Sequence, residues 1–449
     1  MTPPSPTISP AAGNPRALSL LFLAVAMTLP GLVMTVSGFH PSTAPLLGLT
    51  VYGACVVAAA FVLTWAAEVA EGEIGSGLAV VFLALVTVLP EYAIDALLAW
   101  KAGYIEAYQH KALANMTGAN QLLIGAGWPL VAIIVWYRQG ARGVRLRRQR
   151  SGDVVWLLLA TLYSLLLPLK QGACWYDAVV LFAIYAMYVK TSAADDGAPH
   201  DVSTLVGPPR VMVTWPVRRR RAWIVVLFVW AAGAILASAE PFAESLIEAG
   251  HKLHVDDVLL IKWLAPLASE APEFVVVILL TLRGRAEMGM GAFISSKVNQ
   301  WTLLVGGVPV AFCLSSAVHG SGFGACLPLD GHMRAELWLT AAQGLYAVAT
   351  IADLNFSLGQ ALTILGMFLV QFVVTLLLST GLLLGLGFGP EHERPFHLAC
   401  AVVYGVLALE RFFHQRQHLL QRWRDVWHGV PAEAAPRVGE RHAPDEHDA

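Results

Sequence analysis

At two places in this chain, a proline–glutamate pair lies inside an apolar run long enough to cross a bilayer. The first pair is Pro90-Glu91, within residues 87–95, and the second is Pro272-Glu273, within residues 269–274. A charged side chain at mid-membrane depth costs about 3 kcal/mol or more, so it normally faces a partner, a wet cavity or an ion. Two such glutamates in matching places therefore predict one shared site.

The composition is typical of a polytopic membrane protein. Of 449 residues, 57% are hydrophobic and only 13% are charged, and the mean hydropathy is +0.61. No small-residue cleavage site follows the first apolar run, so we expect a retained helix there. The cysteines lack metal-type spacing and are predicted to be inert small hydrophobes without disulfides; they are Cys55, Cys174, Cys313, Cys326 and Cys400.

Twelve segments are apolar enough to span a bilayer, which takes about 20 residues each. The first half holds 17–36, 44–67, 75–100, 112–136, 154–169 and 174–189; the second holds 222–239, 255–282, 288–316, 335–352, 358–387 and 396–412. We therefore predict an all-α integral membrane protein with about 12 transmembrane segments.

Arginines predict the orientation of these segments. They cluster after the fourth segment, at residues 138–150, and after the sixth, at residues 210–221, with fewer after the eighth and the twelfth. Because positively charged loops stay on the cytoplasmic side, even-numbered loops and both termini are expected there. The expected location is a bilayer of the bacterial inner membrane type.

The two motif copies lie five segments apart, so they must enter the membrane in opposite senses. This pattern predicts an inverted-topology repeat, whose substrate site typically lies near the bilayer midplane between broken helices. Pro90 and Pro272 would supply the breaks. The predicted organisation is an N-terminal tail and extra helix (1–43), a first repeat (44–190), a cytoplasmic linker (191–221), a second repeat (222–390), and an extra helix with a cytoplasmic tail (391–449).

These motifs resemble the cation/calcium antiporter superfamily of sodium/calcium and calcium/proton exchangers. Its two repeats carry a Gly-Thr-Ser-x-Pro-Glu element and a later Gly-Ser-Asn element. The matching residues are Thr87, Pro90, Glu91 and Gly118-Ala119-Asn120 in the first copy, and Ser269, Pro272, Glu273 and Asn299 in the second. The resemblance covers roughly residues 65–136 and 239–310. It implies ten core helices, alternating access, and cations held by the paired glutamates with nearby amides and hydroxyls.

Candidate ligands follow from the chemistry of these residues. Glu91 and Glu273 are hard oxygen donors, suited to binding Na⁺, Ca²⁺ or a proton. Neutral carbonyl oxygens could come from the amides Asn120, Gln121, Asn299 and Gln300. The alternative is that these amides form hydrogen bonds between helices and bind no ion. Hydroxyls often bond to their own helix, which makes weaker candidates of Thr87, Ser269, Ser295 and Ser296.

The chain also departs from the superfamily pattern. Val88 and Glu270 replace the serine three residues before each glutamate, and Lys297 stands opposite Gly118. We expect Lys297 to pair with a carboxylate inside the membrane, such as Glu270 or Asp95. In that position its ammonium group would replace one transported cation or carry a proton. The alternative is that the Lys297 side chain reaches the lipid headgroups. Asp95, one helical turn after Glu91, is either a proton carrier or part of an aqueous funnel.

The resulting prediction is a secondary active antiporter that exchanges Ca²⁺ or another cation for Na⁺ or H⁺, without a cofactor and without covalent chemistry. The alternative is a sodium/proton exchanger in which Lys297 and the carboxylates carry protons. In either case, the expected partners of the protein are inorganic cations and the lipid bilayer, and not nucleic acid. His251, His254, His319 and His332 fall in predicted loops, so we expect no zinc site. Motifs for ATP binding or hydrolysis are absent from the sequence, which argues against an enzyme.

Overall fold

The computed structural model describes residues 15–71, 89–194, 205, 207–253, 257–320, 322 and 324–428. The described helices are α1 (Pro15–Val36), α2 (Pro45–Glu71), α4 (Leu89–Ala102), α5 (Tyr108–Leu122), α6 (Trp128–Gln139), α7 (Ser151–Ser164), α8 (Trp175–Ala194), α9 (Pro208–Met212), α10 (Val217–Leu253), α11 (Asp257–Leu282), α12 (Ala286–Asn299), α13 (Val305–Val318), α14 (Gly331–Ile351), α15 (Leu358–Ser379) and α16 (Glu393–His428). Short strands form β1 (Gly143–Arg145), β2 (Gly172–Ala173), β3 (Leu327–Pro328) and β4 (Asn355–Ser357).

The predicted all-α membrane architecture is confirmed. Within the described residues, nine helical stretches are long and apolar enough to cross a membrane. Three more predicted segments coincide with α4, α8 and α14, which fall outside those nine. The first part of the third predicted segment, residues 75–88, lies outside the described part of the chain, and Thr87 lies with it.

The fourth and ninth predicted segments each contain a π-helical turn close to the Asn-Gln pair, offset by two residues between the copies. In the first half η2 (Leu123–Gly127) joins α5 to α6, and in the second half η6 (Gln300–Leu304) joins α12 to α13. Each turn begins at or just after the Asn-Gln pair. Since π-turns within α-helices often mark functional sites, their similar placement in the two halves is consistent with the inverted repeat.

The predicted break at Pro272 is wrong. Helix α11 runs without interruption from Asp257 to Leu282 and contains both Pro266 and Pro272. Transmembrane helices tolerate proline because surrounding helices and hydroxyl side chains can satisfy the freed backbone groups. The irregular backbone of the second half therefore lies at η6 and not at the proline–glutamate pair.

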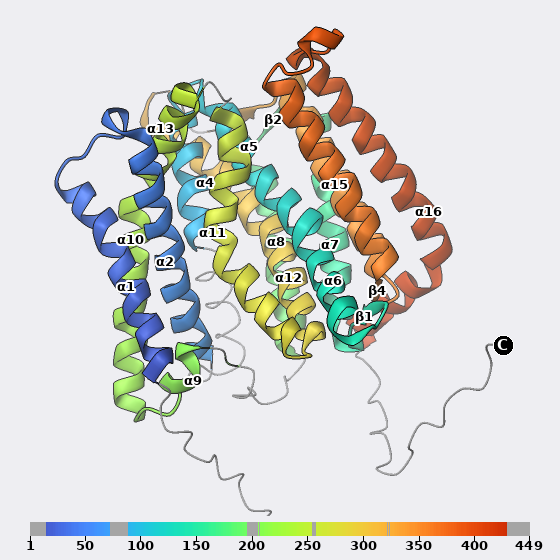
Figure 1. Ribbon diagram of the computed structural model, residues 1–449. Coiled ribbons are helices and arrows are strands. Elements are labelled where there is room, and N and C mark those ends of the chain that lie inside the picture. Colours follow the sequence, from blue (N-terminus) through green and yellow to red (C-terminus); the bar gives the residue numbers. More distant parts are fainter. Residues whose placement is uncertain are drawn as a thin grey trace, which may run out of the picture.

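The two halves interlock at the centre of the molecule. Helix α11 packs against α5 and α6, while α4 packs against α13 and α5. The N-terminal helix α1 lies beside α2 and α10 at one side of the bundle, and α16 lies beside α15 at the other (Figure 1). Together α1, α2 and α10 bury a hydrophobic cluster of their own, separate from the main core.

Two antiparallel ribbons lie at opposite ends of the bundle (Figure 1). Strands β1 and β4 pair at the end that also carries α9, and β2 pairs with β3 at the other end. The β1–β4 ribbon joins two even-numbered predicted loops, and the β2–β3 ribbon joins two odd-numbered ones. The loops thus alternate between the two ends as the segment order predicts.

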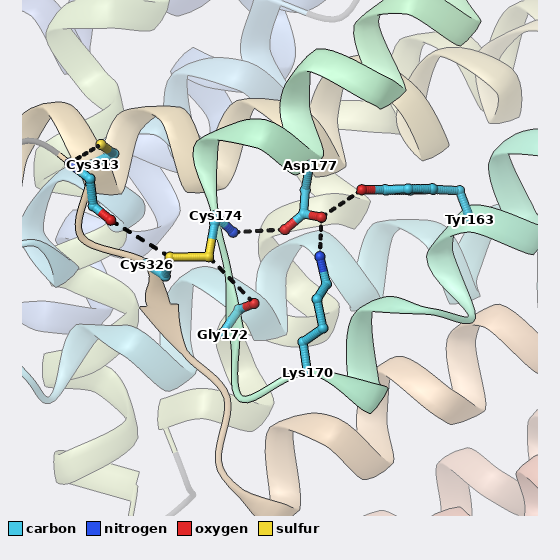
Figure 2. The surroundings of a disulfide bond; sticks show 8 residues. Tyr163, Lys170, Gly172, Cys174, Asp177, Cys313 and Cys326 are labelled. Carbon is cyan, nitrogen blue, oxygen red and sulfur yellow. Dashed lines mark hydrogen bonds and ion pairs between the residues drawn. A yellow bond between two sulfur atoms is a disulfide. The ribbon is translucent and has the colours of Figure 1, made fainter.

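A disulfide beside the β2–β3 ribbon corrects the prediction that all cysteines are inert. Cys174 and Cys326 are bonded, with Cα atoms 4.4 Å apart and a sequence separation of 152. Figure 2 shows Asp177 beside this bond, where it accepts hydrogen bonds from the Cys174 backbone (2.8 Å) and the Tyr163 hydroxyl (2.6 Å) and pairs with Lys170. Linear spacing could not predict this pairing, because it depends on two distant loops meeting at one end.

Candidate transport site

Three glutamates from the two halves converge between α4 and α11. Glu91 lies in the first turn of α4, and Glu270 and Glu273 lie near the middle of α11. Glu91 and Glu270 are only 3% and 4% exposed. The carboxylates of all three interact electrostatically with one another. The structure therefore brings the predicted pair, Glu91 and Glu273, into one neighbourhood and adds Glu270 to it.

Lys297 bridges the two halves from α12. Its side chain is fully buried, and Nζ donates to both the backbone carbonyl oxygen (3.0 Å) and the side-chain oxygen of Asn120 on α5. The ammonium group also lies 4.6 Å from the ring centroid of Trp301. It interacts electrostatically with Glu270 and Glu91.

The expected direct ion pair of Lys297 is wrong. No carboxylate oxygen of the described residues lies within 4.0 Å of its Nζ atom, and its hydrogen-bond partner is the amide residue Asn120. A buried ammonium needs strong acceptors, and the two oxygens of Asn120 meet that need. Sequence spacing could not predict this contact, because it depends on how α5 and α12 face each other.

Amide and phenol groups complete the contacts between the halves. The Tyr92 hydroxyl donates to Asn299 Oδ1 at 3.2 Å, which links α4 to α12. Gln300 Nε2 donates to Glu270 Oε1 at 2.6 Å. Of the four predicted amides, Asn120 thus contacts Lys297, Gln300 contacts Glu270, and Asn299 contacts Tyr92, the residue after Glu91. Tyr92 was not predicted, although it directly follows Glu91.

Gln121 lies in a different polar cluster. Its Nε2 atom donates to Thr340 Oγ1 (2.7 Å) and to Glu336 Oε2 (3.4 Å), and its Oε1 accepts from Gln371 (2.7 Å). Glu336 in turn binds Lys262 Nζ at 2.7 Å. Gln121 therefore does not match its repeat equivalent Gln300. The signal for this cluster was present in the sequence, since Lys262 and Glu336 are charges within predicted spanning segments.

The predicted hydroxyls have different surroundings. Ser296 donates to Glu273 Oε2 at 3.0 Å and so belongs to the site. Ser269 donates to carbonyl oxygens of its own helix, and Ser295 accepts from Arg150 Nη1 at 3.1 Å, away from the glutamates. Asp95 is buried on α4, where its Oδ1 accepts from Asn115 Nδ2 at 2.6 Å.

Several buried carboxylate oxygens lack a hydrogen-bond partner within the described part of the chain. They are Oε1 of Glu91, Oδ2 of Asp95 and Oε2 of Glu270. Leaving a buried acceptor unsatisfied costs about 1–3 kcal/mol, and more when it is charged. A bound cation or proton would satisfy these oxygens. An all-oxygen set of carboxylates and amides suits hard cations such as Ca²⁺ and Na⁺.

Comparison with known proteins gives the same picture. A family model described as "Sodium/calcium exchanger protein" matches residues 44–193 and 223–387. The crystal structure titled as the H⁺/Ca²⁺ exchanger CAX is 36% identical, with a TM-score of 0.81 over 91% of this chain and 97% of that chain. The structure of native YfkE is 13% identical, with a TM-score of 0.57 over 80% and 100% of the two chains, and so supports the fold alone. No curated protein sequence matches the chain.

Proposed function

Because the chain belongs to the sodium/calcium exchanger family, we propose that it is a secondary active antiporter that moves Ca²⁺ across a membrane in exchange for H⁺. Its relatives are exchangers, and it is a transporter and not an enzyme. The similar CAX structure, at 36% identity, is that of an H⁺/Ca²⁺ exchanger, which supports Ca²⁺ and H⁺ as the pair of substrates.

The convergence of Glu91, Glu270 and Glu273 carries this proposal. These carboxylates come from both halves, interact electrostatically, and include buried oxygens without a partner among the described residues. If all three are ionised, the neighbouring buried Asp95 keeps its proton and Lys297 is protonated, the formal charges sum to −2. One divalent cation or two protons neutralise that charge. The site can then lose its net charge with either substrate, which is what exchange between them requires.

We further infer alternating access around this site. An empty site that keeps its charge is costly to enclose in a low-dielectric interior, so the occluded form is favoured only when the site is loaded. This penalty couples the two fluxes. The Cys174–Cys326 disulfide supports a non-cytoplasmic position for the β2–β3 end, since disulfides persist in oxidising compartments. Both termini would then face the cytoplasm of a bacterial-type inner membrane.

Flux through proteoliposomes tests the proposal. Glu273→Gln keeps the shape of the side chain and its hydrogen bonding but removes its charge, so Ca²⁺ uptake driven by a pH gradient should fall to the level of empty liposomes. Glu410→Gln on α16 is the matched control, because Glu410 is exposed at the surface, and it should transport normally. Normal flux in Glu273→Gln would remove this glutamate from the mechanism. Proton flux driven by Na⁺ without Ca²⁺ movement would favour the sodium/proton alternative.

A further inference from the structure

A second cluster of ligand-type side chains lies between α14 and α16, apart from the three glutamates. His332 and Glu336 are four residues apart on α14, and Glu393 and His397 are four residues apart on α16. Residues at this spacing lie on one face of a helix, and the two helices pack together. One ligand atom from each residue lies within 4.8 Å of all the others. The cluster corrects the prediction that His332 is a solvated loop residue.

The Nδ1 nitrogen of His397 lies within this cluster, next to Glu336. The residue is fully buried, and its Nε2 atom lies 2.9 Å from the Thr375 hydroxyl. Its Nδ1 atom lies 2.9 Å from Glu336 Oε1, but the geometry of this contact is not that of a hydrogen bond, and Nδ1 has no other partner within the described residues. At this distance from a carboxylate oxygen, Nδ1 must either carry a proton, as in an ion pair with Glu336, or give its lone pair to a bound cation.

The outer contacts of the cluster also resemble those of a metal site. A histidine that binds a metal usually has its second ring nitrogen held by another polar group, which is the position of Thr375 on α15. Metal-binding carboxylates are themselves hydrogen-bonded, and Lys262 Nζ lies 2.7 Å from both oxygens of Glu336. This ammonium repels a nearby cation. The two ionised glutamates carry two negative charges against the single positive charge of Lys262, so the cluster still attracts a cation.

We propose that His332, Glu336, Glu393 and His397 bind one divalent transition-metal ion of the Zn²⁺ type. Two imidazoles with two carboxylates suit Zn²⁺, whereas Ca²⁺ prefers oxygen ligands alone. A tetrahedral Zn²⁺ site has ligand atoms about 3.3 Å apart, so modest side-chain movements would complete the site. The ion would enter at the bundle end that carries β3, because the His332 side chain there is 37% exposed.

Metal binding to the purified full-length protein tests this proposal. Protein stripped by a chelator is dialysed against micromolar Zn²⁺ in the presence of excess Ca²⁺, and bound zinc is measured by mass spectrometry. We expect one Zn²⁺ per chain that Ca²⁺ does not displace. Co²⁺ in place of Zn²⁺ should give the visible absorption of a four-coordinate site. Neither readout depends on transport, so each result stands whether or not the protein exchanges Ca²⁺.

His332→Ala and His397→Ala should each weaken the apparent Kd for Zn²⁺ by about 100-fold or more, since even the loss of an outer partner costs 10–100-fold. His414→Ala, on the exposed surface of the same helix α16, should leave binding unchanged. If His397→Ala fails to fold, the partly exposed His332 still provides the comparison. Absence of Zn²⁺ from the wild-type protein, or equal binding by His332→Ala and wild type, would reduce the cluster to an ion-pair network.

Discussion

Lys297 and Glu270 are the two charged departures from the superfamily pattern, and both occur in the second copy of the motif. They interact electrostatically with each other, although Lys297 donates its hydrogen bonds to Asn120. An added negative charge and an added positive charge thus occur in the same neighbourhood. Each offsets part of the cost of burying the other, which gives a physical reason for the two substitutions to coexist.

Replacing Lys297 by alanine tests whether its ammonium group takes the place of one cation. Lys297→Ala leaves Glu270 without this compensating charge. We therefore expect Ca²⁺ turnover to fall at least about tenfold, or the number of protons exchanged per Ca²⁺ to change. A fixed positive charge that stabilises the site by about 1.4 kcal/mol corresponds to a tenfold effect on the rate. Flux against pH is measured in matched liposomes at fixed membrane potential.

The exposed Lys190 provides the control for this substitution, and Lys190→Ala should behave as wild type. If the lysine itself carries the proton, the flux of Lys297→Ala should also depend less on pH. Identical pH profiles and stoichiometry for Lys297→Ala and wild type would show that the Lys297 ammonium does not take the place of a transported cation.

Duplication explains which site residues could be predicted. The proximity of Glu91 and Glu273 was predictable because each copy of the motif marks its equivalent, and the structure adds the contacts of Ser296 with Glu273 and of Asn299 with Tyr92. The direction in which each helix faces was not predictable. Gln121 follows Asn120 directly, yet the two side chains bind groups on different helices, because consecutive residues on an α-helix point about 100° apart.

At the scale of helices, the bilayer itself made the segments predictable, since its thickness imposes a minimum apolar length and its lack of water imposes helical hydrogen bonding. The π-turns η2 and η6 were not predictable from that constraint. The two turns share no sequence pattern, since η2 reads Leu-Ile-Gly-Ala-Gly and η6 reads Gln-Trp-Thr-Leu-Leu. The continuity of α11 through its two prolines was likewise not predictable from that constraint.

A close backbone contact between α5 and α11 gives a prediction at this scale. A Cβ atom on Gly118 would lie 1.7 Å from the carbonyl oxygen of Lys262, and a backbone atom cannot move aside as a flexible side chain can. Gly118→Ala should force the helices apart and destabilise the protein by roughly 1–3 kcal/mol, as overpacking typically does. Thermal unfolding in detergent measures the loss of stability, and flux should fall with it.

Gly307→Ala is the matched control for this substitution. A Cβ atom on Gly307, in α13 of the other half, would have nothing within 4 Å, and alanine favours helix by about 1 kcal/mol over glycine. This variant should be as stable as wild type or slightly more stable. Equal melting temperatures for Gly118→Ala and wild type would show that α5 and α11 can separate at little cost.

Across the whole molecule, different interactions stabilise the two ends of the bundle, namely an ion pair at one end and a disulfide at the other. At the end with β1 and β4, Arg148 binds Asp425 of α16 through two hydrogen bonds of 2.8 and 3.2 Å. At the end with β2 and β3, the Cys174–Cys326 disulfide joins the loop before α8 to the loop before α14. The covalent fastening thus lies at the end that lacks the arginine clusters, as expected if that end faces an oxidising compartment.

Removing this disulfide should lower stability without abolishing the fold. In the chain-entropy model, a cross-link that closes a loop of 152 residues contributes up to about 5 kcal/mol; a denatured state held in a membrane or micelle has less entropy to lose, so the measured effect should be smaller. The double variant Cys174→Ser with Cys326→Ser should therefore melt at a lower temperature than wild type. Cys400→Ser, which replaces a free cysteine, should not.

Labelling with a thiol reagent that cannot cross membranes, applied to intact cells before and after reduction, tests on which side of the membrane this bond lies. New labelling of Cys174 and Cys326 only after reduction places the β2–β3 end outside, whereas free, unlabelled thiols at both positions before reduction would place that end in the cytoplasm and reverse the proposed topology.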